Sequence, residues 1–193
     1  MGLPFLRYTM LKKFIKYVML PLLAIAILWV SYFLLYGNFH KVDKDVYRSA
    51  QLFSFNLPYY LEKHQIKSIL NLRSIKKPKP KSWYVNEVKI AKEMGVIRYD
   101  YPIGDRGEAS IAQMDKIVQI IKDAPKPLLI HCKAGADRTS LASALYLHAI
   151  QKDTDARRAI SILYGHFPWF GSRTIAMDRS FEKYIKKDSN ATK

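Results

Sequence analysis

The sequence has a single cysteine, Cys132, and half as many acidic residues as basic ones. One cysteine excludes an intrachain disulfide, so cysteine usage does not report the redox compartment. The 16 Asp and Glu residues against 32 Lys and Arg leave a net charge of +16, which favours anionic partners such as phosphate esters, acidic lipid surfaces or nucleic acid. Nucleic-acid binding rests on this charge alone, because no aromatic and basic repeat accompanies it, and we expect no nucleic-acid partner.

Histidines at ligand-like spacing are also lacking. Neither His148 nor His166 has a neighbour at a spacing typical of metal sites, so we expect no metal and no cofactor. No internal repeat is visible. The length permits one domain of about 150 residues with a substantial core, plus an appendage.

Charge is absent from residues 17–36, an apolar run with tyrosines at both ends. Its length matches the hydrocarbon thickness of a bilayer, and the tyrosines suit the membrane interfaces. We interpret the run as an uncleaved single-pass anchor. A cleaved signal peptide is the alternative, although no small-x-small cleavage site follows before Gly37.

The orientation of this anchor is predicted from the basic residues on its two sides. Four precede the run and three follow it: Arg7, Lys12, Lys13 and Lys16, then Lys41, Lys44 and Arg48. The positive-inside rule therefore favours a cytoplasmic N-terminus and a domain on the outer face, periplasmic or extracytoplasmic.

The stretch from Leu128 to Ser140 organises the remaining sequence. An apolar run after Pro127 ends at His131, a seven-residue loop extends from Cys132 to Arg138, and a segment rich in Ala, Leu and Ser follows. This pattern predicts a buried strand, a tight turn and a helix that begins where the turn ends.

A loop of this kind is suited to binding phosphate. Its backbone N–H groups can form a nest, the helix N-terminus adds positive charge, and Arg138 can hold two phosphate oxygens. Gly135 permits close backbone approach. The same field favours thiolate over thiol, which would make Cys132 a nucleophile, whereas a small buried cysteine near an arginine is the alternative. The phosphate-binding residues that we predict are Lys133, Ala134, Gly135, Ala136, Asp137 and Arg138.

The loop resembles the cysteine-dependent protein tyrosine and dual-specificity phosphatase superfamily. The signature of that superfamily is His-Cys, five residues and Arg followed by Ser or Thr, matched here by His131, Cys132, Arg138 and Thr139. The Cys-Lys-Ala-Gly start is similar to loops of phosphoinositide phosphatases, and the Asp-Arg-Thr end to myotubularin and Sac-type lipid phosphatases. The resemblance implies that Cys132 is the nucleophile, that Arg138 binds the phosphate and that the Thr139 hydroxyl assists breakdown of a phosphocysteine.

The leaving oxygen needs a proton, so a carboxylic acid must reach it from another loop. The segment Tyr101–Asp105 looks like the general-acid loop of the superfamily, which carries an aromatic residue, Pro, two residues and Asp. We carry the acid role to Asp105, whose alternative is a turn residue. The other candidate acids are Asp100, Glu108 and Asp137.

Residues 40–187 predict an α/β phosphatase domain with a central sheet flanked by helices, as in dual-specificity phosphatases. Residues 1–16 form a basic tail and 188–193 a polar tail. We expect strands at 46–51, 66–72, 96–101 and 128–131, and helices at 57–64, 82–94, 111–123, 138–151, 156–164 and 174–186. The proline-rich basic loop 76–81 is a solvated connector or a lip for an anionic substrate.

These features predict a membrane-anchored phosphatase that acts through a phosphocysteine. Its substrate would be a lipid or glycolipid phosphate, or else a phosphotyrosine or phosphoserine protein. Two alternatives stay open, namely a catalytically silent module that binds a phosphorylated partner and a rhodanese-like sulfurtransferase, which also places a cysteine in a strand-to-helix loop.

Overall fold

A computed structural model of the chain describes residues 10–75, 78–169 and 173–191. The chain divides into two compact units, residues 1–36 and 37–193.

The first unit is one apolar helix. It contains a π-helical turn, Ile15–Met19, followed by α2, Leu20–Tyr36. Among the described residues this is the one helix long and apolar enough to cross a membrane, over Met10–Tyr32, and a signal sequence meets the same criteria. This range begins earlier than the predicted run at 17–36 and includes three of the four predicted flanking basic residues.

The second unit is built on a five-stranded sheet in the order β1-β2-β5-β3-β4. The strands are β1 (His40–Asp43), β2 (Val46–Ser49), β3 (Ser68–Asn71), β4 (Ile97–Asp100) and β5 (Leu128–His131). All neighbours pair in parallel except β1 and β2. The register aligns the last residues of the parallel strands, so Ser49, His131, Asn71 and Asp100 end at one edge. Loops that leave this edge can meet at one site.

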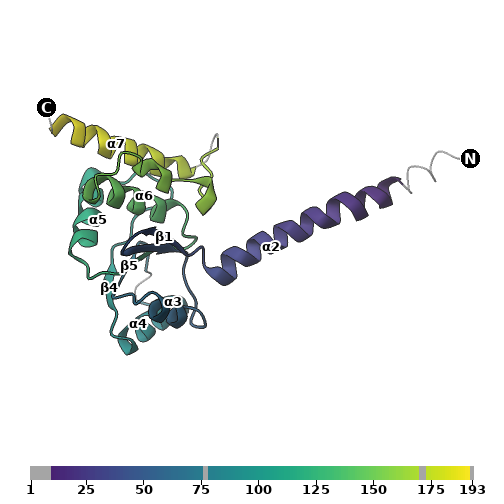
Figure 1. Cartoon of the computed structure of the whole chain (residues 1–193), viewed down its shortest axis with the longest axis horizontal. Helices are drawn as coiled ribbons and strands as arrows, with labels where there is room; N and C mark the ends of the chain where they lie inside the picture. The colour runs from purple at the N-terminus through teal and green to yellow at the C-terminus, as the bar shows by residue number, and fades with distance from the viewer. Residues whose placement is uncertain (1–9, 76–77, 170–172, 192–193) are drawn as a thin grey trace, which may run out of the picture. The chain divides into compact units, whose positions relative to one another are not determined.

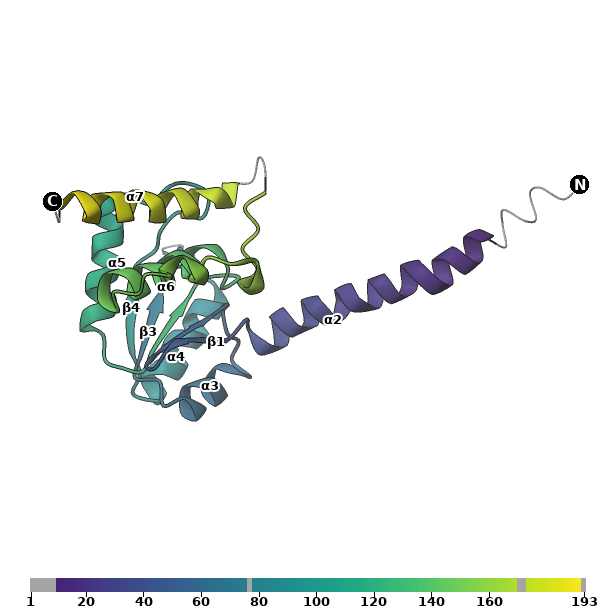
Figure 2. The same ribbon diagram turned by 45° about the horizontal axis from the view of Figure 1, so that its top comes forward.

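Helices cover both faces of the sheet (Figures 1 and 2). On one side lie α3 (Leu57–Lys63) and α4 (Ser82–Glu93), and on the other α5 (Ile111–Asp123), α6 (Asp137–Leu145) and α7 (Ala176–Ala191). Two buried apolar clusters follow this division: Ile69 and Leu129 face α3 and α4, whereas Leu70 and Ile130 face the other helices. The α/β fold that the strand and helix pattern predicts is therefore confirmed.

A capping box at Ser110 opens α5. The Ser110 hydroxyl accepts from the Gln113 amide, and the Gln113 side chain accepts from the Ser110 amide. Gly95 ends α4 in the left-handed conformation that favours glycine.

Four elements differ from the sequence-based expectation. Strand β1 was not expected. The helix predicted at 156–164 is instead two 3-10 turns, Ala156–Ala159 and Ile162–Tyr164, because Ser161 between them is extended and its side chain caps the second turn. The helix expected over 138–151 changes after α6 into a π-helical turn, Tyr146–Ile150. Helix α7 continues to Ala191, through residues expected to belong to a polar tail.

Candidate active site

The cysteine loop leaves the central strand of the sheet, as the sequence predicts. Strand β5 is buried along its whole length, and α6 begins five residues after Cys132, which is a free cysteine with 2% exposure. Gly135 has a φ of +68°, and a Cβ there would lie 2.5 Å from the Ala50 nitrogen and 2.6 Å from the Ser49 carbonyl carbon. Only glycine fits this approach of the loop to the end of β2.

Two carbonyl groups of the loop accept hydrogen bonds from residues near strand β2. The Asn38 amide group donates to the Ala134 carbonyl (3.1 Å), and the Gln51 backbone amide donates to that of Lys133 (3.2 Å). Within the described residues, the backbone amides of 133–138 donate to no carbonyl or side-chain oxygen. With its carbonyls fixed and its amides unpaired, the loop has the arrangement of an anion-binding nest.

Arg48, on strand β2, also donates hydrogen bonds to this loop. Its guanidinium is 1% exposed, donates to the carbonyls of Gly135 (2.9 Å) and Ala159 (2.8 Å) and to the Ser140 hydroxyl (2.7 Å), and stacks on the Tyr164 ring. Burial lowers the pKa of Arg48 to about 10, so it stays cationic at neutral pH. A fixed positive charge therefore lies against the loop from Cys132 to Arg138. Sequence reasoning missed this role and counted Arg48 only among the basic residues that follow the apolar run.

The predicted nucleophile, arginine and acid share one cavity of about 220 Å³. Its lining residues are Asp105, Arg106, Cys132, Lys133, Ala134, Asp137, Arg138, Arg173 and Thr174. The buried Arg138 is oriented by the carbonyls of Leu72 (3.2 Å) and Ile103 (3.5 Å), which accept from its Nη1. The structure thus brings Asp105 to the same space as Cys132, from a loop after β4.

Thr139, which follows Arg138 in α6, is fully buried and does not line this cavity. Its Oγ1 has no hydrogen-bond partner among the described residues. A buried hydroxyl without a partner is uncommon in folded proteins. The Thr139 hydroxyl is therefore not committed to another group of the described structure.

Each of the other candidate acids has a partner of its own, and two of them lie outside the cavity. Asp100 accepts hydrogen bonds from Asn71, Tyr84 and Arg98, and it does not line the cavity. Glu108 lies 4.0 Å from Arg179, also outside the lining. Asp137 does line the cavity, and its Oδ1 lies 2.8 Å from His166.

The structure also shows a buried partner of His131. Glu87 is 3% exposed, and its Oε1 lies 3.3 Å from Nε2 of His131 and 2.9 Å from Nη2 of Arg98. Burial raises the pKa of Glu87, but His131, Arg98 and the hydrogen bond from Gln51 outweigh burial and lower it to about 2. On α4, Glu87 is buried with Ala91, whereas the apolar Val88 and Met94 are exposed.

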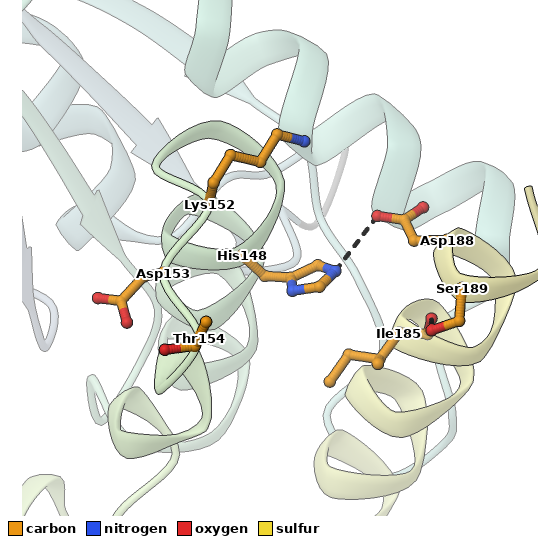
Figure 3. A pocket seen from close by; sticks show the side chains of 7 residues that line it. All are labelled: His148, Lys152, Asp153, Thr154, Ile185, Asp188 and Ser189. Atoms are coloured by element: carbon orange, nitrogen blue, oxygen red, sulfur yellow. Dashed lines mark hydrogen bonds and ion pairs between the residues drawn. The ribbon is translucent and has the colours of Figure 1, made fainter. Parts of the chain in front are cut away.

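A larger cavity of about 590 Å³ lies between the π-helical turn after α6 and the C-terminal part of α7 (Figure 3). His148 and Asp188 face each other across it, at 3.2 Å. None of the predicted site residues lines this cavity. Among the described residues, no group of three or more His, Cys, Asp or Glu side chains is placed to hold a metal ion.

A family model described as "DSP-PTPase phosphatase fused to NAD+ Kinase" matches residues 39–187. A comparison with curated proteins finds no match. The solved catalytic core of the PP-IP phosphatase SIW14 from S. cerevisiae, in complex with citrate, is 21% identical with a TM-score of 0.56, covering 80% of this chain and 92% of that chain. PTPMT1 in complex with PI(5)P is 17% identical with a TM-score of 0.54 (78% and 98%), and Tk-PTP in its active form is 18% identical with a TM-score of 0.54 (76% and 97%). At these identities the solved structures show a shared fold.

Proposed function

Because the chain belongs to the DSP-PTPase family of cysteine-dependent phosphatases, we propose that it is a membrane-anchored enzyme that removes phosphate from a lipid or glycolipid. The observation that carries this proposal is the shared cavity of Cys132, Arg138 and Asp105 at the phosphate loop. Family membership favours hydrolysis over a silent phosphate-binding module and over a sulfurtransferase.

The proposed reaction has two steps. The Cys132 thiolate attacks phosphorus, the bond from phosphorus to the leaving oxygen breaks, and Asp105 gives that oxygen its proton. Water then attacks the phosphocysteine, the sulfur leaves as a thiolate, and the Asp105 carboxylate takes a proton from the water. Arg138 holds two phosphate oxygens through both steps, and the buried Thr139 hydroxyl donates to the departing sulfur.

The charge around the cavity supports a polyanionic substrate. Arg106, Lys133 and Arg173 line the cavity in addition to Arg138. Burial lowers the pKa of Arg73, and the nearby positive charge of Arg138 lowers it further. Arg73 therefore lies close to the same site. Two relatives with the same fold are a PP-IP phosphatase and a protein crystallised with PI(5)P, which supports a substrate with more than one phosphate group.

The apolar helix supports the placement of the enzyme at a membrane. Its stretch Met10–Tyr32 has a length and composition suitable for crossing a bilayer. With the basic residues before it on the cytoplasmic side, the phosphatase domain lies on the outer face, close to lipid headgroups. The basic loop 76–81, of which residues 76–77 lie outside the described structure, stays a predicted lip for such headgroups.

A comparison of two substrate classes tests the proposal. Phosphate release is measured with the full chain in phosphatidylcholine vesicles that contain PI(5)P, and with phosphotyrosine and phosphoserine peptides at equal concentration. We expect faster release from the lipid, and none from either substrate with Cys132→Ser. Release from peptides alone would replace the lipid substrate with a phosphoprotein. Thiocyanate formation from thiosulfate and cyanide without phosphate release would overturn the phosphatase mechanism.

A further inference from the structure

His166 is a buried histidine that connects the phosphate loop to the C-terminal helix. Its side chain is 1% exposed. Nδ1 lies 2.8 Å from Oδ1 of Asp137, and Nε2 lies 2.8 Å from Oδ2 of Asp178. Asp137 is the first residue of α6 and lines the cavity of Cys132, whereas Asp178 lies in the first turn of α7.

These two contacts determine the protonation of His166. A neutral imidazole has one N–H donor, and both ring nitrogens face carboxylate oxygens, so the bridge requires an imidazolium. Burial lowers the pKa of His166, but hydrogen bonds and charges from Asp137 and Asp178 outweigh burial and raise it. The charged groups around His166 are Asp137 from α6, Asp178 from α7, and Arg157, which lies 3.0 Å from Asp178.

Without the contact to His166, the Asp137 carboxylate would compete with the substrate phosphate for the backbone amides of the loop. The unpaired amides of the loop attract the nearest anion, and a carboxylate in the first turn of a helix can itself accept from such amides. Its charge would also repel a phosphate dianion in the same cavity. The contact with His166 directs the carboxylate toward α7 and compensates its charge.

We propose that His166 is a positioning residue that keeps the Asp137 carboxylate off the amides of the phosphate loop and so keeps the loop open for the substrate phosphate. This inference rests on the proposed function, because it takes the loop as the substrate site. Because Asp137 faces His166 in this contact, protonation of the leaving oxygen is left to Asp105.

Steady-state kinetics of the full chain in detergent micelles test this role. We expect His166→Asn to raise KM for a phosphate ester about tenfold, the order of one uncompensated charge beside a bound anion, with kcat changed less than about threefold. In an Asp137→Asn background the same substitution should leave KM unchanged, because no carboxylate remains to be held. The matched control is His148→Asn, which removes a histidine paired with Asp188 at 3.2 Å in the cavity of Figure 3 and should leave both constants unchanged.

Three results would overturn the inference. One is a loss of kcat in His166→Asn without a change in KM. Another is an equal rise in KM with and without the Asp137 carboxylate. The third is an abolished kcat in Asp137→Asn, which would identify Asp137 as the proton donor.

A binding measurement tests the same role without turnover and without substitution of His166. Sulfate, which stays a dianion across the range, is titrated by calorimetry against Cys132→Ser between pH 5 and 9. We expect the sulfate Kd to rise as pH increases through the raised pKa of His166, and Asp137→Asn to remove that rise. If the sulfate Kd had the same pH dependence in Cys132→Ser and in Cys132→Ser with Asp137→Asn, the positioning role would be refuted. The expected pattern together with a wild-type chain that releases no phosphate would refute the proposed function and limit the role of His166 to keeping the loop open for an anion.

Discussion

Replacement of Glu87 by glutamine should destabilise the phosphatase domain strongly. Glu87→Gln keeps the size of the side chain and removes the charge that faces His131 and Arg98, so that Arg98 keeps the Asp100 carboxylate at 2.9 Å but loses that of Glu87 at the same distance. The pKa of Glu87 is about 2, against an ordinary value of 4.5. This difference corresponds to about 3 kcal/mol of folding stability at neutral pH. For a domain of this size the loss should lower Tm by about 6–12 °C.

The pH dependence of this effect has a definite sign. Because the pKa of Glu87 is lower in the folded state than in the unfolded chain, its contribution is complete above pH 4.5 and is lost as pH falls toward 2. The difference in stability between wild type and Glu87→Gln should therefore shrink as pH falls below 4.5, where the protonated acid resembles the amide.

Thermal unfolding of the full chain in detergent, followed by circular dichroism at several pH values, measures this difference. The matched control is Glu93→Gln on the same helix, where the side chain is 60% exposed and lies 3.9 Å from Lys89. An exposed pair of this kind contributes at most about 0.5 kcal/mol. Equal losses for the two variants would refute the reasoning, as would a difference that persists unchanged at pH 2.

Three further substitutions test the site. Asp105→Asn should lower kcat about 10²- to 10⁴-fold, measured as phosphate release, and an equal loss with Glu108→Gln would reassign the acid. Gly135→Ala should destabilise the fold and abolish sulfate binding. The control Gly95→Ala has the same φ of +68° but nothing within 4 Å of the new Cβ, so it should lower stability by only about 1 kcal/mol. Similar losses of stability in the thermal unfolding of the two variants would argue against the close approach of the loop to β2. Arg48→Met should lower stability by about 3 kcal/mol or more, because it leaves buried carbonyl groups without a donor, and a stable variant with normal phosphate release would contradict the supporting role of Arg48.

Local sequence patterns predicted the parts of the site that depend on neighbouring residues. The apolar run before His131, the glycine in the loop and the helix after Arg138 are all contiguous in the chain. The strand and capped helix on either side of Asp105 also have local signals, so its position at the sheet edge could be predicted. Its place in the same cavity as Cys132 is consistent with the predicted acid role, which Asp105→Asn tests.

The supports of the loop depend on contacts between distant residues. Arg48 and Gly135 are 87 residues apart, and Glu87 and His131 are 44 residues apart. No periodicity indicates that a glutamate on a helix with a polar sequence is buried, because its partners lie on other strands. His166 had no neighbour at a ligand-like spacing, since its two carboxylate partners are 29 residues before it and 12 residues after it.

The central claim is that Cys132 carries the phosphoryl group during turnover. Acid quenching of the full chain within the first turnovers on PI(5)P vesicles, followed by mass spectrometry of its peptides, measures this directly. We predict one phosphoryl group on Cys132 in the wild type, and neither label nor phosphate release in Cys132→Ser. Phosphate release at the wild-type rate by Cys132→Ser, or a label on another residue, would contradict the mechanism.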